Sequence, residues 1–145
     1  MKAVFINKQG GPEVLEYGEM PDPIAASNEV IVDIHAASVN GADWKVRTGT
    51  HGSVPEYPYI LGRDFSGVIK FAGSEVNDLI VGEEVFGVCV TGQEGAYAEK
   101  IAVNAEIIAR KPEDISHTVM SALSLAGLTA LVAIEDTIML QTGEK

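Results

Sequence analysis

The sequence contains a single cysteine, Cys89, among its 145 residues. One cysteine excludes a disulfide bond within the chain and any metal centre built from several thiolates. Cys89 lies in the apolar run Val85–Val90, and such a setting favours a buried, inert thiol over a nucleophile. Histidine is scarce too: His35, His51 and His117 have no cysteine or acidic partner at metal-site spacing. We therefore expect hydrogen-bonded or solvated histidines and no metal ligand.

Basic residues are also few, with 10 Lys and Arg against 21 Asp and Glu and a net charge of -11. Nucleic acids bind to cationic surfaces, so we expect no nucleic-acid partner. Residues 119–134 carry no charge, but this run is shorter than the ~20 residues that a helix needs to cross a bilayer. We expect a buried helix pair there and no membrane partner. Residues 1–6 resemble a short strand and not a signal peptide, so the expected location is cytoplasmic.

What the chain does contain is a series of short apolar segments separated by Gly, Pro, Asn and Asp. Alternating and β-branched residues predict strands at 2–7, 14–17, 30–37, 67–73, 85–90 and 97–103. Short strands at such spacing are typical of a barrel or sandwich. A short helix is predicted from Asn40 to Thr48, because Gly49 is a C-cap signal.

The pattern becomes helical near the C-terminus. Ser116 is a candidate N-cap for a helix through Leu125. Gly127 predicts a break, followed by a second helix whose apolar positions recur at helical spacing. The chain thus divides into a mostly β part, residues 1–115, and C-terminal helices, residues 116–145.

Several motifs resemble those of the medium-chain dehydrogenase/reductase superfamily. Residues 38–43, Ser-Val-Asn-Gly-Ala-Asp, and residues 60–67, Ile-Leu-Gly-Arg-Asp-Phe-Ser-Gly, resemble its catalytic segments. Residues 81–87, 95–99 and 125–130 resemble further motifs in the same order, so the likeness covers essentially the whole chain. The resemblance implies a GroES-like, partly open β-barrel over residues 1–115 and interdomain helices over residues 116–145.

Two positions place the chain within that superfamily. In its zinc enzymes a Cys stands where this chain has Asn40, and a His stands where it has Arg63. Asn is a poor zinc ligand, and Arg is a permanent cation that repels the metal. The resemblance is therefore to the zinc-independent quinone oxidoreductases and their relatives. It implies hydride transfer from a nicotinamide to a quinone, an enone or a similar carbonyl acceptor.

The candidate catalytic residues are Asn40, Asp43 and Arg63. Asn40 is a candidate for hydrogen bonding to the substrate or the nicotinamide, or for capping the helix that follows it. Arg63 could offer N–H donors to a carbonyl or phosphate oxygen, or it could form an ion pair with Asp64 or Asp43 that fills the place of the metal. Both alternatives are open for each residue at this stage.

Further site residues follow from the resemblance. Trp44, Tyr57 and Tyr59 are candidates for the wall of a substrate cleft. Thr129 matches a threonine that approaches the nicotinamide in relatives, and Lys45 stands where relatives often carry a tyrosine. We therefore expect Lys45 and Thr129 to contact the cofactor, with a small molecule as the substrate.

The superfamily's nucleotide-binding part has no counterpart in this sequence. Residues like 141–145 precede a Rossmann domain in relatives, and no Gly-x-Gly-x-x-Gly phosphate loop occurs here. NADP is therefore expected from the resemblance only, and we expect the chain to be inactive alone. We also expect self-association through residues 119–134, since a partner domain would cover them. The alternatives to an enzyme domain are a GroES-like binding module and a non-catalytic relative.

Overall fold

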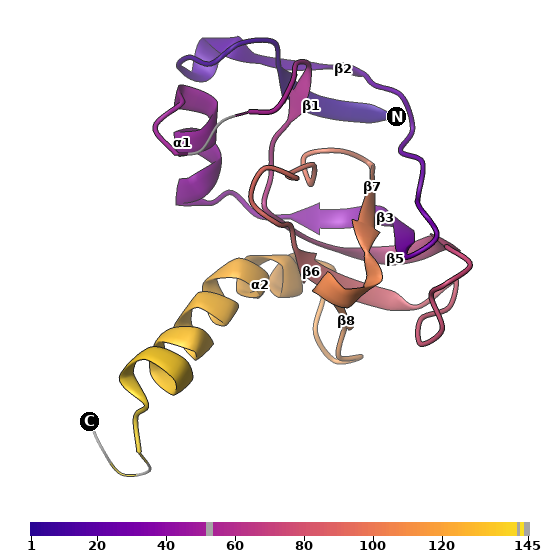
Figure 1. Ribbon diagram of the computed structural model, residues 1–145, viewed down its shortest axis with the longest axis vertical. Helices are drawn as coiled ribbons and strands as arrows, with labels where there is room; N and C mark the ends of the chain where they lie inside the picture. Colours follow the sequence, from indigo (N-terminus) through magenta and orange to yellow (C-terminus); the bar gives the residue numbers. More distant parts are fainter. Residues whose placement is uncertain (52–53, 142, 144–145) are drawn as a thin grey trace.

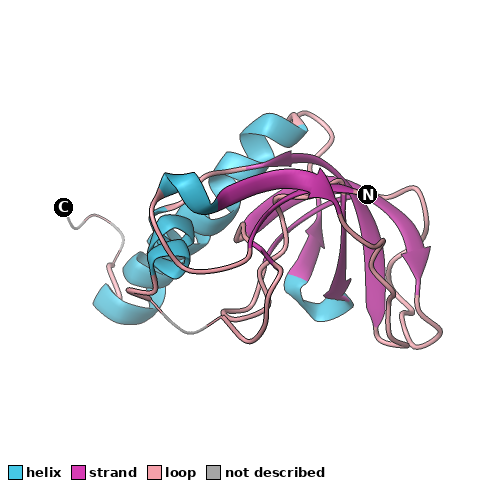
Figure 2. Cartoon of the chain, turned by 90° about the horizontal axis from the view of Figure 1, so that it is seen from above, coloured by secondary structure: helices cyan, strands magenta, loops and turns pink. Residues whose placement is uncertain are grey.

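The computed structural model describes residues 1–51, 54–141 and 143 and contains two antiparallel sheets (Figure 1). The smaller sheet has the order β2-β1-β4, formed by Leu15–Glu19, Lys2–Ile6 and Tyr59–Ile60. The larger sheet has the order β7-β3-β5-β6-β8, formed by Lys100–Asn104, Glu29–Ala37, Asp64–Ala72, Glu84–Val88 and Ile108–Arg110. The sheets curve around a common interior without closing, so the mostly β, partly open barrel is confirmed (Figure 2).

Each predicted strand is present, with boundaries that differ by up to three residues. Two strands were missed. β4 spans only Tyr59–Ile60 inside a proline-containing loop, and β8 spans only Ile108–Arg110. They are too short to show an alternating pattern, and they form because β1 and β6 offer free edges to pair with.

The main core lies inside the larger sheet. Val30 and Val32 of β3 and Phe65 and Ile69 of β5 are fully buried and pack together. Residues an even number of positions apart on a strand face the same side of the sheet, as Val30 and Val32 do on β3 and Phe65 and Ile69 do on β5. Cys89 packs against the same cluster, so its predicted burial is confirmed, and burial raises the pKa of its thiol to about 12.

A second, smaller core fastens α1, Gly41–Thr48, to the smaller sheet. It comprises Ile6, Val14, Val46, Tyr59 and Leu61. Val46 is the buried apolar residue of α1, while Ile6 and Tyr59 come from paired strands. This packing fixes the helix that begins at Asn40.

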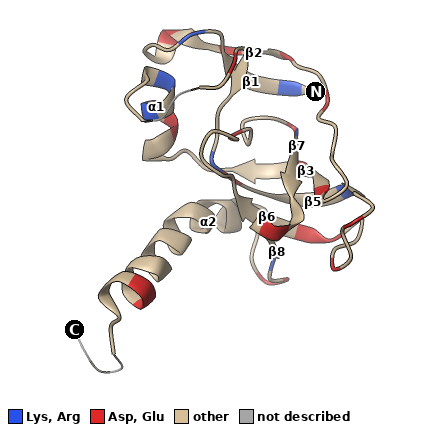
Figure 3. Cartoon of the chain, viewed as in Figure 1, with Lys and Arg blue, Asp and Glu red and all other residues tan. Residues whose placement is uncertain are grey.

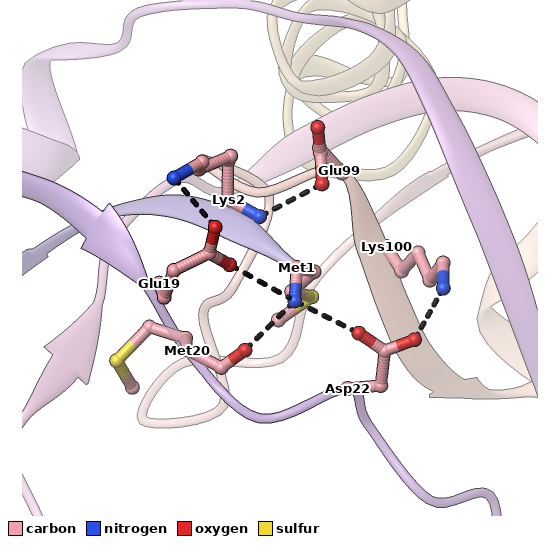
Figure 4. Close-up of polar contacts among 7 residues, drawn as sticks. All are labelled: Met1, Lys2, Glu19, Met20, Asp22, Glu99 and Lys100. Carbon is pink, nitrogen blue, oxygen red and sulfur yellow. Dashed lines mark hydrogen bonds and ion pairs between the residues drawn. The ribbon is translucent and has the colours of Figure 1, made fainter.

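The two sheets are also joined by charges around the N-terminus (Figure 4). The Met1 ammonium donates to Asp22 Oδ1 at 2.9 Å, and the other oxygen of Asp22 accepts from Lys100 of β7. The backbone N–H of Lys2 donates to Glu99 at 2.7 Å. Lys100 and then the N-terminus lower the pKa of Asp22 to about 2. These side chains are exposed, so each pair stabilises the fold only slightly.

The C-terminal region is one helix, not a pair. α2 runs over His117–Val132 and continues without interruption into a π-helical segment, Ala133–Ile138. The prediction of a break at Gly127 is wrong. A glycine inside a helix lowers the stability of the helix by only about 1 kcal/mol relative to alanine. No atom lies within 4 Å of the place where a side chain at Gly127 would begin, so no packed neighbour explains the glycine. The predicted N-cap is confirmed, because Ser116 Oγ accepts from Val119 N.

The predicted burial of this region is also wrong. α2 begins against β3, β5 and β6, and its C-terminal part extends away from the sheets (Figures 1 and 2). Large apolar side chains are exposed on more than one side of this helix, and α2 carries no Lys, Arg, Asp or Glu (Figure 3). Six of them, here called the α2 apolar surface, are Val119, Leu123, Leu128, Leu131, Val132 and Ile134. The helical span His117–Ile138 is long and apolar enough to cross a membrane. A single helix of this kind is weak evidence, so this property by itself assigns no membrane role.

Candidate active site

The site is built where β3 ends and α1 begins. Asn40 has an extended backbone and is the N-cap residue of α1, as predicted. Its backbone N–H donates to Asp43 Oδ2 at 2.7 Å, which is one half of a capping box. Gly49 ends the helix with a φ of 77°, a left-handed conformation that favours glycine.

The Asn40 side chain is held by its neighbours. Its amide nitrogen donates to Ser38 Oγ and to Asp64 Oδ1, both at 3.1 Å. These two acceptors are themselves only 2.7 Å apart, so they lie on the same side of the amide nitrogen. The bonds anchor the Asn40 side chain to Ser38 and Asp64, but they do not commit both N–H groups of the amide.

Asp64 is the buried centre of this network. It accepts from Ser38 Oγ at 2.7 Å, from Asn40, and from the backbone N–H of Leu125 at 3.3 Å. Ser38 precedes α1, Asp64 begins β5, and Leu125 lies within α2. One carboxylate thus fixes three elements relative to one another.

Asp43 is buried as well and faces the loop between β6 and β7. Its Oδ2 accepts from the Tyr97 hydroxyl at 2.7 Å as well as from Asn40 N. Burial raises the pKa of Asp43, and its hydrogen bonds to Asn40 and Tyr97 oppose that rise. Burial and then the Asp43 carboxylate raise the pKa of Tyr97 well above its ordinary value. Tyr97 therefore remains a neutral donor that locks Asp43, and through it Asn40, in place.

Arg63 lies next to this network, and its side chain is only 12% exposed. The predicted ion pair with Asp64 or Asp43 is wrong. Arg63 lies in a bend just before β5, whereas Asp64 begins that strand and is directed at Ser38 and Asn40. The ion-pair partner of Arg63 is Glu94, whose side chain is 1% exposed, with Nη1 and Oε1 3.8 Å apart.

Glu94 was not among the predicted site residues. Its Oε2 accepts from the Tyr59 hydroxyl and from Gly92 N, and its own N–H donates to the Tyr59 oxygen. Within the described part of the chain, Arg63 Nε and Glu94 Oε1 are buried without a hydrogen-bond partner. The one signal in the sequence was the position of Glu94 directly before the Gly-Ala-Tyr-Ala-Glu motif.

The predicted cleft and cofactor residues are spread over different elements. Trp44 and Lys45 are exposed on α1, with Lys45 Nζ 5.7 Å from the Trp44 ring centroid. Tyr57 is exposed, whereas Tyr59 is buried with its hydroxyl on Glu94. Thr129 is exposed on α2, and its hydroxyl donates to Leu125 O at 2.7 Å. Their roles toward substrate and cofactor stay predictions.

Residues 26–113 match the family model of the alcohol dehydrogenase GroES-like domain. The chain belongs to this family. It is 31% identical over 145 residues to the quinone oxidoreductase of Sus scrofa, covering 99% of this chain and 44% of that protein.

Solved structures place this GroES-like domain in the quinone oxidoreductase-like branch of the medium-chain dehydrogenase/reductase superfamily. The quinone oxidoreductase from Coxiella burnetii has a TM-score of 0.90 and 34% identity, over 98% of this chain and 46% of that one. The Escherichia coli quinone oxidoreductase complexed with NADPH has a TM-score of 0.88 and 30% identity, over 94% and 41% of the two chains. The chain therefore spans less than half the length of these relatives.

The residues of this GroES-like domain do not fit a zinc ion at the position of Arg63. A guanidinium stays protonated and repels a cation. Residues 1–51, 54–141 and 143 contain no group of three or more His, Cys, Asp or Glu side chains that could hold a metal ion. The rings of His35 and His117 pack against each other at a tilt of 51°, with centroids 4.5 Å apart, and His117 Nδ1 is hydrogen-bonded to Ser66 Oγ.

Proposed function

We propose that this chain is the catalytic domain of a zinc-independent, NADPH-dependent oxidoreductase. The proposed reaction transfers hydride to a quinone, an enone or a similar carbonyl acceptor. The names of the relatives support the reaction class, and the NADPH complex of the Escherichia coli enzyme supports the cofactor.

The proposal rests on the burial and the hydrogen bonding of the Arg63 side chain. Arg63 is a largely buried cation that makes no side-chain hydrogen bond to the described residues, and its charged partner is 3.8 Å away. Asn40, in contrast, is anchored to Ser38 and Asp64. We therefore assign the donor for the oxygen of an acceptor to Arg63. Negative charge develops on that oxygen as hydride arrives, and a fixed cation stabilises it.

The other site residues hold this geometry. Asp43 receives the Asn40 backbone N–H and the Tyr97 hydroxyl, so the start of α1 is rigid. NADPH would supply the hydride. Lys45 and Thr129 are the residues of this chain proposed to contact it. The sequence has no glycine-rich phosphate loop, so we propose that residues 1–145 alone bind NADPH weakly and do not turn over.

The test measures NADPH oxidation by the longest natural form of the protein, with quinones and enones as acceptors. Arg63→Ala should lower kcat by about 100-fold, the usual cost of one donor to a developing oxyanion. Arg110→Ala, which removes an exposed arginine paired with Glu83, is the matched control and should keep wild-type kcat. An active Arg63→Ala variant would assign Arg63 a structural role only.

Asn40→Ala separates the scaffold from the chemistry. Loss of the N-cap residue and its bond to Asp64 should lower the stability of the fold by about 1 kcal/mol. A loss of kcat beyond the folded fraction would place Asn40 in the reaction, and full activity would remove it. Absence of NADPH oxidation by the wild-type protein with every acceptor would favour the binding-module alternative.

A further inference from the structure

Glu94 is one of the most completely buried carboxylates of the described chain, with its side chain 1% exposed. Burial of a carboxylate is unfavourable unless hydrogen bonds and an opposite charge compensate it. One oxygen, Oε2, accepts from the Tyr59 hydroxyl and from Gly92 N. The glutamate N–H also donates to the Tyr59 oxygen at 3.2 Å. Glu94 is therefore fixed at both its backbone and its side chain.

The second oxygen, Oε1, faces Arg63 in an unusual way. Its distance to Arg63 Nη1 is 3.8 Å, whereas a charge-assisted hydrogen bond is roughly 2.8 Å long. A bidentate Arg–carboxylate pair would use two N–H groups of the guanidinium. Here the carboxylate neutralises the buried cation without using those groups. The arrangement offsets the charge of Arg63 and leaves its terminal N–H groups, though not the buried Nε–H, for another acceptor.

The backbone reinforces the pairing of these two side chains. Gly95 N and Ala96 N both donate to Gly62 O at 3.2 Å, and Cys89 N donates to Arg63 O at 2.6 Å. The loop between β6 and β7, which carries Glu94, is thereby bonded on both sides to the segment that carries Arg63. The two backbone segments cannot move apart without breaking these bonds.

We propose that Glu94 is a positioning residue, which orients the Arg63 guanidinium toward the acceptor oxygen and is itself anchored by Tyr59. This inference deepens the proposed function and rests on it for its catalytic consequence. The positioning itself is a property of the 145-residue chain and can be measured without activity.

The first measurement uses NMR on the 145-residue chain. In the wild type the Arg63 Nε–H should exchange slowly with water, because the nitrogen is buried. Glu94→Gln keeps the shape of the side chain and removes its charge, which leaves the buried guanidinium without a charged partner. The guanidinium should then turn toward solvent, and the exchange rate of Arg63 Nε–H should rise at least about 10-fold. Glu113→Gln removes an exposed carboxylate and is the matched control. Unchanged Arg63 exchange in Glu94→Gln would overturn the proposal, whether or not the longer protein is active.

The second measurement separates positioning from folding in the longest natural form. Glu94→Gln should lower kcat by about 10- to 100-fold with little change in the KM for NADPH, because misorientation affects the reacting geometry. Glu94→Asp keeps the charge and should recover part of the loss. Tyr59→Phe, which removes only the anchor, should give an intermediate kcat. Wild-type kcat in Glu94→Gln would exclude a positioning role. An inactive wild-type protein would refute the proposed function, and the NMR measurement alone would then test whether Glu94 orients Arg63.

Discussion

The backbone N–H of Leu125, inside α2, donates to Asp64 at 3.3 Å. The same carboxylate accepts from the side chain of Asn40 at 3.1 Å. The helix that projects from the sheets is therefore tied, through one buried residue, to the start of α1. A shift of α2 changes the setting of Asn40, which makes Asp64 the link between the helix and the site.

Asp64→Asn should destabilise the fold strongly. Ser38, Asn40 and Leu125 all donate to this carboxylate, and an amide would present N–H groups to some of these donors. Loss of hydrogen bonds to a buried charged group costs about 2–3 kcal/mol. Urea unfolding of the 145-residue chain measures this, with the exposed Asp114→Asn as the control. Equal stabilities of the two variants would contradict the role given to Asp64.

His117 should make stability depend on pH. It contacts His35 on β3, Ser66 on β5 and Glu84 on β6, with Lys111 nearby. Burial and then His35 lower its pKa in the folded state, against an attraction from Glu84. As the pH falls below about 6.5, His117 therefore takes up its proton in the unfolded chain before it does so in the folded chain. The contribution of His117 to the stability of the fold is present above that pH and is lost as the pH falls toward the folded pKa of His117.

Urea unfolding between pH 5 and 8 measures the effect, and His117→Gln should remove part of the slope. The exposed His51→Gln should keep the slope of the wild type. A slope that is the same in His117→Gln would show that other groups cause it.

The isolated chain should self-associate through the α2 apolar surface. Val119, Leu128 and Leu131 are about half exposed, and exposed apolar patches beyond a few hundred Å² commonly recruit a partner. Light scattering at increasing concentration should show a mass above that of one chain. Leu128→Glu combined with Leu131→Glu should restore the monomer. A clean wild-type monomer at high concentration would refute this prediction.

The protein should contain far less than one zinc per chain. Arg63 repels a metal, and Asn40 directs its amide nitrogen at Asp64 instead of offering a ligand. Metal analysis of protein purified without chelators measures the content. Stoichiometric zinc that survives dialysis would refute zinc independence.

The sequence alone was sufficient for much of the fold, because the signals were local. Alternating apolar residues located the longer strands, and Asn40 and Gly49 marked the two ends of α1. Ser116 likewise marked the start of α2. The GroES-like family followed from short motifs in a fixed order, which need no knowledge of tertiary contacts.

Tertiary structure alone decided the partners within the site. Arg63 pairs with Glu94 and not with the adjacent Asp64, because Asp64 is held by Ser38 and Asn40 and the loop of Glu94 is bonded beside Arg63. α2 passes through Gly127 because one glycine costs less than ending the helix. The strands β4 and β8 exist only because longer strands offer them an edge. Such pairings depend on residues far apart in the chain, whose proximity local sequence patterns do not encode.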